Sequence, residues 1–300
     1  MPSTLRHNFY VLISAMLVAI SWVIAEIALH FYEVPVIWTA ILTNLSGGLG
    51  LLLLAPQISR PSVWTFTWQQ WVRLIIAAFC IYVASTLLAY YSINLIGAGK
   101  STLLGLLQAP AVIILSIIFL GERLLLKHWL AGALMIFGAF LINFNPEALT
   151  FEFGSGELAR VALAFFVGVG IVLMKPIVVN INEIQVTAVS MIISVFFLCA
   201  AIPWFDSGLQ FSLPALGLLA IVGILRGLSW YFYYVPLPII GASRAIILFG
   251  SYAFFTVMLQ LIIVAITPNL GTQLPSNLAM ALIGGVVIVV GIVVMTRSSD

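Results

Sequence analysis

The sequence predicts an all-α membrane protein of about ten transmembrane helices, and three observations predict it. Hydrophobic residues make up 63% of the 300-residue chain and charged residues 7%, with a mean hydropathy of +1.24. A soluble domain carries about 25% charged residues, so this chain has too few to cover a surface facing water. Its apolar stretches run for about 20 residues, the length that spans the hydrocarbon core as a helix. The shorter alternating stretches of a transmembrane β-barrel are not seen.

Ten apolar stretches, each ended by polar residues or by Gly and Pro, are the expected spans. In chain order they cover 9–31, 35–55, 71–96, 101–121 and 128–145, then 157–178, 184–204, 213–236, 243–266 and 276–296. The first is too long for the core of a signal peptide and has no small-residue cleavage site, so we expect an uncleaved span. The connections are short and leave no room for a soluble catalytic domain.

The basic residues of the short loops predict the orientation, because the cytoplasmic loops of membrane proteins carry an excess of Lys and Arg. With the N-terminus inside, seven basic residues lie near the cytoplasmic side: Arg6, Arg60, Arg73, Arg123, Lys127, Arg244 and Arg297. Only Lys100 and Arg160 are then expected near the outer side, where Glu147, Glu152, Glu157 and Asp206 also collect. We therefore predict that both termini are cytoplasmic.

An internal repeat divides the chain. Ile96-Gly97-Ala98-Gly99-Lys100 returns 144 residues later as Ile240-Gly241-Ala242-Ser243-Arg244, and Tyr90-Tyr91 has a counterpart in Tyr233-Tyr234. Five spans in each half make the halves inverted relative to each other, as in many secondary transporters. We predict two inverted five-helix repeats, residues 1–145 and 146–300.

The stretch 89–144 resembles the drug/metabolite transporter superfamily, and specifically its EamA-type ten-helix members. The residues that carry the resemblance are Leu107-Gln108-Ala109-Pro110 in the fourth span, Leu120-Gly121-Glu122-Arg123 before the fifth, and Trp129-Leu130-Ala131-Gly132 at the start of the fifth. The second half has Thr267-Pro268-Asn269-Leu270-Gly271 where a second Gly-Glu-Arg would stand, which leaves the substrate class open. The resemblance implies an exporter of small metabolites in the inner (plasma) membrane, with a central cavity lined by helices 1, 3, 4, 6, 8 and 9.

Arg226 is the first candidate for substrate binding, because it lies near the middle of the eighth span. A charged residue at a helix centre costs about 2.5–3.5 kcal/mol on insertion scales, and a guanidinium is not neutralised at physiological pH. Arg226 could hold a substrate carboxylate or phosphate. Its alternative role is structural, in an ion pair or as a cap on backbone carbonyls.

Glu26, in the outer half of the first span, is the candidate proton carrier, since ionisable groups in membranes often form proton relays. The Ala25-Glu26 pair also resembles the small multidrug resistance proteins, in which the Glu binds protons and cations. The alternative is a salt bridge or a side chain that reaches the outer interface. Lys175, before Pro176 in the sixth span, is a candidate second basic contact, or else it extends to the inner interface.

The cavity wall is expected to contain Trp22, Tyr82, Trp230 and Tyr252, which could stack on rings or hold cations; ordinary packing is the alternative. Gln108 could contact substrate. Pro110 is the candidate hinge, because proline removes a backbone hydrogen bond and kinks a helix.

No cofactor, metal site or catalytic function is expected. The three histidines, His7, His30 and His128, are far apart, and the sequence has no paired carboxylates or nucleophile motif. Gly97-Ala98-Gly99-Lys100-Ser101-Thr102 is not a phosphate-binding P-loop, because that motif needs Gly at position 94, which is Asn. A net charge of +2 gives no support for a nucleic-acid partner.

The leading hypothesis is a secondary active transporter that exports an amino acid or a related amphipathic carboxylate by alternating access. Its partners would be the small-molecule substrate, the lipid bilayer and protons as the coupling ion, and it would be a monomer or a weak dimer. One alternative is an exporter of cationic or quaternary amines that uses Glu26 and the aromatic walls. Another is a translocator of lipid-linked headgroups.

Overall fold

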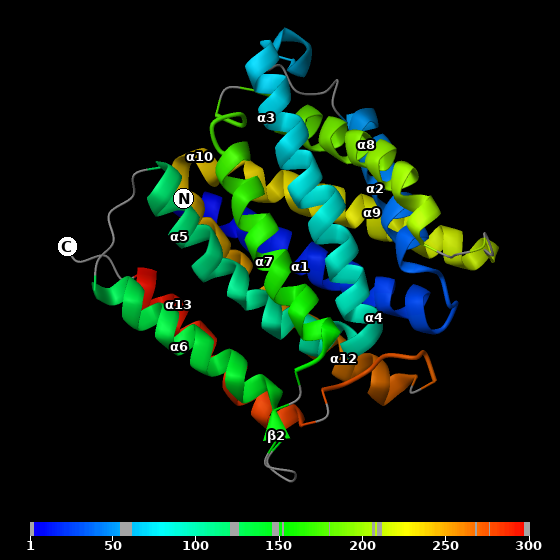
Figure 1. The fold of residues 1–300 in the computed structure, drawn as a ribbon, viewed down its shortest axis with the longest axis vertical. Coiled ribbons are helices and arrows are strands. Elements are labelled where there is room, and N and C mark those ends of the chain that lie inside the picture. Colours follow the sequence, from blue (N-terminus) through cyan, green and yellow to red (C-terminus); the bar gives the residue numbers. More distant parts are fainter. Residues whose placement is uncertain are drawn as a thin grey trace.

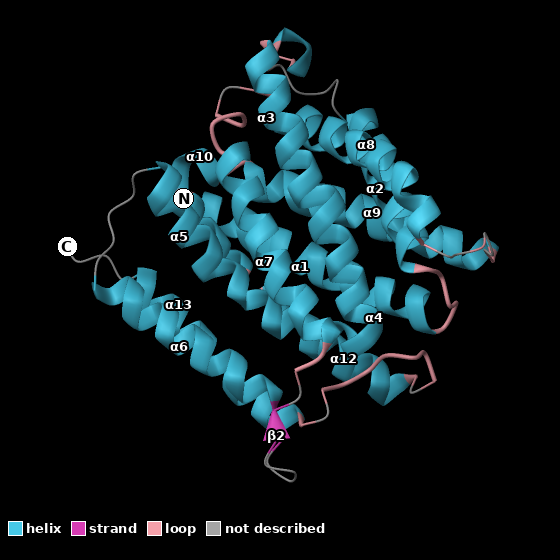
Figure 2. Ribbon diagram, viewed as in Figure 1, coloured by secondary structure: helices cyan, strands magenta, loops and turns pink. Residues whose placement is uncertain are grey.

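The chain folds into a bundle of helices (Figures 1 and 2). The computed structural model describes residues 3–54, 62–120, 126–145, 150–151, 153–179, 181–205, 208, 212–267, 269–275 and 277–296. The helices of the first half are α1 (Ser3–His30), α2 (Val36–Leu54), α3 (Trp68–Ala78), α4 (Ser85–Leu104), α5 (Gln108–Leu120) and α6 (Leu126–Asn143). Those of the second half are α7 (Ser155–Met174), α8 (Glu183–Ala201), α9 (Leu213–Tyr234), α10 (Leu237–Ile240), α11 (Ala242–Phe249), α12 (Tyr252–Ile266) and α13 (Leu278–Thr296).

Short irregular pieces complete the described chain. A π-helix (Phe79–Ala84) joins α3 to α4, and a 3₁₀ turn (Gly105–Leu107) joins α4 to α5. Two further 3₁₀ turns cover Val63–Thr65 and Ile202–Trp204. The two-residue strands β1 (Phe144–Asn145) and β2 (Thr150–Phe151) pair antiparallel between α6 and α7. The all-α prediction is therefore confirmed in its class.

Seven helical stretches within the described residues are long and apolar enough to cross a membrane. One of them, Trp68–Phe119, is 52 residues long, more than twice the roughly 20 residues that a crossing needs. It contains the third expected span and nearly all of the fourth. Ala133–Asn143 and Leu278–Gly291, in α6 and α13, are shorter apolar helices. Each expected span thus coincides with helix, while the count of ten crossings and the cytoplasmic position of both termini stay predictions.

Polar residues at the helix starts explain where several helices begin. The side chain of Asn182 accepts a hydrogen bond from Gln185 N at the start of α8, and Ser212 accepts one from Ala215 N at the start of α9. Such caps satisfy backbone N–H groups that have no partner within the helix. Several residues that entered the sequence analysis lie outside the described ranges: Arg60, Gly121, Glu122, Arg123, Glu147, Glu152, Asp206, Pro268 and Arg297.

Packing between the helices follows a pattern that is the same in both halves. In the first half α1 packs on α9, α11 and α12, and in the second half α7 packs on α3, α4 and α5. Other large contacts join α2 to both α8 and α9. A further one joins α6 to α13, and these two helices lie side by side along one edge of the bundle (Figure 1). A Cβ added at Gly138 of α6 would lie 2.5 Å from the carbonyl oxygen of Gly284 of α13, and the reverse distance is also 2.5 Å. The absence of side chains therefore allows this pair to approach closely.

The chain breaks its helices at two glycines that are 144 residues apart. Gly97 has φ 72° and ψ 162° within α4, and Gly241, before α11, has φ 82° and ψ 160°. This region of backbone conformation is essentially restricted to glycine. The repeated sequence thus forms the same local structure in both halves.

Replacing Gly97 by alanine should destabilise the protein more than replacing Gly241 does. Both substitutions strain the backbone, by about 1–3 kcal/mol. At Gly97 the added Cβ would also lie 2.6 Å from the carbonyl oxygen of Gln273, whereas nothing lies within 4 Å of a Cβ at Gly241. Thermal unfolding of the two variants in detergent should show the larger fall in Tm for G97A. Equal falls would show that the close contact with Gln273 contributes nothing.

Candidate functional site

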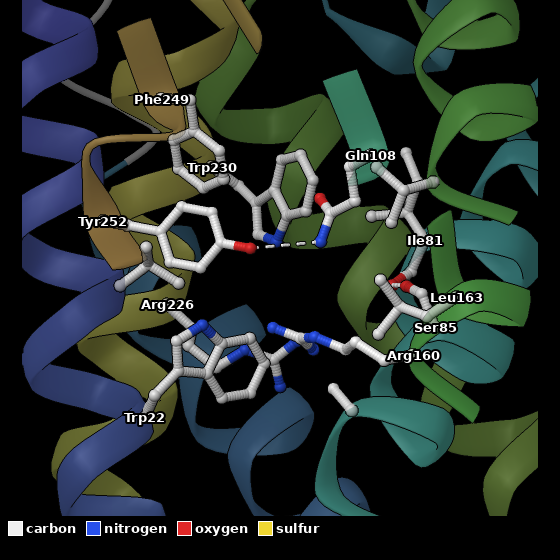
Figure 3. A pocket seen from close by; sticks show the side chains of 13 residues that line it. Trp22, Ile81, Ser85, Gln108, Arg160, Leu163, Arg226, Trp230, Phe249 and Tyr252 are labelled. Carbon is white, nitrogen blue, oxygen red and sulfur yellow. Dashed lines mark hydrogen bonds between the residues drawn. The ribbon is translucent and has the colours of Figure 1, made fainter. Parts of the chain in front are cut away.

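A small cavity lies in the middle of the bundle (Figure 3). It is lined by Val18 and Trp22 of α1, Ile81, Ser85 and Ala89 of the third expected span, Gln108 of α5, Arg160, Leu163 and Val167 of α7, Arg226 and Trp230 of α9, and Phe249 and Tyr252 of the ninth. These elements belong to expected spans 1, 3, 4, 6, 8 and 9, the set that the resemblance implied. Its volume is about 30 Å³, and a water needs about 10–15 Å³. A metabolite would therefore require the walls to move apart.

Arg226 reaches this cavity from α9 and is only 3% exposed. Nη1 donates to the Tyr90 hydroxyl at 3.0 Å, and Nη2 donates to Thr86 Oγ1 at 2.9 Å. A longer contact of 3.5 Å joins Nη1 to Thr43 Oγ1. These neutral acceptors fix the guanidinium without neutralising its charge, and Nε has no hydrogen-bond partner among the described residues.

Arg160 reaches the same cavity from α7, and its side chain is 1% exposed. Nε donates to the carbonyl oxygen of Ser101 at 2.7 Å, while Nη1 and Nη2 have no hydrogen-bond partner in the described part of the chain. The orientation analysis expected Arg160 near the outer side, which stays a prediction, but its side chain faces the interior of the bundle and lines the cavity. The helical spacing of Arg160 with Leu163 and Val167, three and seven residues on, was a signal that it lies on a buried face.

Trp22 brings the two arginines together. The guanidinium carbon of Arg226 lies 5.1 Å from the centroid of the Trp22 ring, and that of Arg160 lies 5.7 Å from it. Both distances are within the range of cation–π attraction. Figure 3 shows the two guanidinium groups pointing toward each other in the cavity. No carboxylate among the described residues forms an ion pair with either group.

The rest of the wall is mostly as expected. The Gln108 amide donates to the Tyr252 hydroxyl at 3.4 Å across the cavity (Figure 3), and Trp230 lines the same space. Tyr82 does not line it. Its ring packs edge-on against Trp230 with centroids 5.8 Å apart, and its hydroxyl lies 3.4 Å from that of Tyr234. Tyr82 therefore supports the wall from behind.

Glu26 is fully buried but lies outside the residues that line the cavity. Oε1 accepts hydrogen bonds from the backbone N–H groups of Ala98 and Gln273, each at 3.0 Å. Oε2 accepts one from the side-chain amide of Gln260 at 2.6 Å. The carboxylate thus ties α1 to the helix that starts after Gly97 and to two positions in the second half of the chain.

Three further residues lie away from the cavity. Lys175 is partly buried at the end of α7, and Pro110 is in the first turn of α5, three residues after the 3₁₀ turn. The hinge role of Pro110 stays a prediction. Lys100 is buried and pairs with Glu157 at 2.8 Å. The described residues contain no group of three His, Cys, Asp or Glu that could hold a metal ion.

Comparisons with known proteins give a family and a fold. Residues 5–144 match the model of the EamA-like transporter family, which confirms the resemblance inferred from the sequence. No curated protein matches the chain. A solved structure, described only as the crystal structure of a protein, is 20% identical, with 97% of this chain and 95% of that chain covered and a TM-score of 0.66. At this identity the likeness concerns the fold alone.

Proposed function

From the match of residues 5–144 to the EamA-like transporter family, we propose that the protein is a secondary active transporter that exports a small metabolite bearing an anionic group. The substrate binds in the central cavity, with its anionic group at Arg226. An amphipathic carboxylate, such as an amino acid, matches a cation surrounded by the rings of Trp22, Trp230 and Tyr252. The membrane in question is the inner (plasma) membrane, and the working unit is a monomer or a weak dimer.

The observation that carries this proposal is the uncompensated charge of Arg226. A buried charge is expensive unless it is paired. Among the described residues, the Arg226 guanidinium contacts hydroxyl acceptors and aromatic faces. Its free Nε faces a cavity, as intramembrane ionisable residues on transport pathways do. An anionic substrate supplies the missing negative charge when it binds.

Alternating access follows if residues 1–145 and 146–300 act as two inverted repeats around this cavity. The matching contacts of α1 and α7 support this division, as do the matching breaks at Gly97 and Gly241. The cavity lies where helices from both halves meet. Rocking of one half against the other would open it to either side.

Glu26 is suited to couple protons to this movement. All three groups that contact the carboxylate are N–H donors, which match the ionised, acceptor-only form. Protonation would remove an acceptor site and weaken the tie between the halves. A proton that reaches Glu26 would thus favour the open form.

The geometry favours an anionic over a cationic substrate. Export of amines would need a negative site among the aromatic walls, but both Glu26 oxygens are occupied by donors, and Glu26 is not in the lining of the cavity. The ring of Trp22, which could hold a cation, already lies within 6 Å of two arginines. Translocation of a lipid-linked headgroup is the remaining alternative and shares the anionic chemistry.

Efflux from proteoliposomes tests the proposal. The vesicles are loaded with a metabolite mixture that includes amino acids, other organic anions and quaternary amines, and what leaves is identified by mass spectrometry with and without a pH gradient. We expect anion-bearing metabolites to leave faster than from protein-free vesicles. Selective loss of amines would contradict the proposal, and if no metabolite leaves, a lipid-flip assay tests the remaining alternative.

A further inference from the structure

We infer that the cavity is a site for a doubly charged oxyanion, a phosphate group or a dicarboxylate, held by Arg160 together with Arg226. This inference rests on the proposed function, because it assumes that substrate occupies this cavity. It goes beyond it by assigning Arg160 to the site and by fixing the charge of the ligand.

The charge balance of the cavity requires two negative charges. Arg160 and Arg226 are both almost fully buried and remain charged at physiological pH. Ion pairs between them and acidic side chains are absent from the described residues. Two like charges repel strongly in a medium of low dielectric constant. A single carboxylate would leave one of them uncompensated, whereas a dianion neutralises both.

The free hydrogen-bond donors match such a ligand. Nη1 and Nη2 of Arg160 form a fork that can bind two oxygens of one carboxylate or phosphate. Nε of Arg226 supplies a third donor for another oxygen. A phosphate group has three strong acceptor oxygens, and a dicarboxylate has four. The three donors therefore have acceptors in either ligand.

Arg160 is held so that its fork stays available. The hydrogen bond from Nε to Ser101 fixes the inner end of the guanidinium. Gly105 leaves space for the outer end, because a Cβ at this position would lie 2.8 Å from Arg160 Nη2. The Tyr252 hydroxyl also lies against Gly105 and interacts with the Arg160 guanidinium. This hydroxyl carries no charge, so the local structure positions the fork without neutralising it.

Binding of matched anions to the protein in phosphatidylcholine nanodiscs tests the inference. The probes are methyl phosphate against dimethyl phosphate, and succinate against monomethyl succinate, so that each pair differs by one charge. The measurement is calorimetry at about pH 8, which lies above the second pKa of a phosphate monoester at about 6. We expect one dianion to bind at least about tenfold more tightly than its monoanionic partner, because the monoanion loses a hydrogen bond between charged groups. If phosphatidic acid in the disc competes with the probes, the source of the phosphate is a lipid headgroup. If it does not compete, the ligand is a soluble anion.

Variants of Arg160 complete the test. R160Q should bind the two members of each pair within about threefold of each other, while R160K, which keeps the charge but loses the fork, should restore part of the preference. R73Q, at an exposed arginine of α3, removes the same charge and should change nothing. Any of three results would overturn the inference: the wild type binds both members of each pair equally, R160Q retains the preference, or none of the probes binds. The proposed function fails with it only if anionic metabolites also do not leave the proteoliposomes.

Discussion

R226Q should reduce transport of an anion-bearing substrate by about 100-fold. The substitution removes the buried charge that the anionic group pairs with, and truncating one partner of a buried charge pair costs roughly 2–5 kcal/mol, where about 1.4 kcal/mol is tenfold. Transport of an amine, if the protein performs any, should be unaffected. The measurement is the initial rate of counterflow in proteoliposomes, which requires binding and translocation but no driving gradient.

Controls must separate the charge of Arg226 from its structural contacts. R226Q also leaves the hydroxyls of Thr86 and Tyr90 without their donor, so the variant should be compared with T86V, which removes one contact and keeps the charge. We expect T86V to lose only about tenfold in transport, because it removes a single hydrogen bond to a charged group, worth about 1.5 kcal/mol at the lower end of the usual range, and keeps the charge. Anion transport by R226Q at the wild-type rate would rule out Arg226 as the anion contact.

Composition and hydropathy were sufficient for the fold class, since lipid leaves the backbone little choice but the helix. The sequence also pointed to five residues of the cavity wall: Trp22, Gln108, Arg226, Trp230 and Tyr252. Arg226 and Trp230 lie in the middle of a span, and Gln108 and Tyr252 interrupt apolar stretches, so the sequence marks them as unusual. The sequence shows well how far a residue lies from the ends of its span, and this position is what identified these residues.

The sequence says less about which face of a helix a residue occupies and which distant residues it contacts. Arg160 lies only five residues after α7 begins at Ser155, so its depth alone indicated an interface. Its place beside Trp22, 138 positions earlier in the chain, arises only when α1 and α7 pack around a common cavity. The same holds for Glu26, whose three donors lie 72, 234 and 247 residues away.

E26Q should abolish coupling to the pH gradient while leaving the fold and the exchange reaction intact. A gradient of one pH unit can sustain a concentration ratio of at most about tenfold for each coupled proton. We therefore expect the wild type to accumulate substrate up to about that ratio against its gradient and E26Q to reach a ratio of about one. Counterflow, which needs no net proton movement, should continue in E26Q at a rate within a few fold of the wild type.

The hydrogen bonds around Glu26 explain why glutamine should be tolerated there. The amide oxygen of the introduced side chain can accept from the backbone N–H groups of Ala98 and Gln273, as Oε1 of the carboxylate does. Its NH₂ group would meet Gln260, whose own Oε1 has no partner among the described residues and can accept once that amide flips. E26A offers no such replacement and should lower Tm, since it leaves the backbone N–H groups of Ala98 and Gln273 without their acceptor and removes one acceptor of the Gln260 amide.

The control for E26Q is H30N, one turn further along α1. His30 is the titratable neighbour of Glu26, and its Nε2 lies 3.1 Å from the carbonyl oxygen of Asn94. An asparagine can keep a donor for that oxygen but does not titrate, so H30N should retain gradient-driven accumulation if Glu26 carries the proton. Loss of accumulation in H30N with retention in E26Q would assign coupling to His30. Accumulation in both variants would show that neither Glu26 nor His30 couples transport to protons. The hydrogen bonds of Glu26 to the two halves would then have a structural role only.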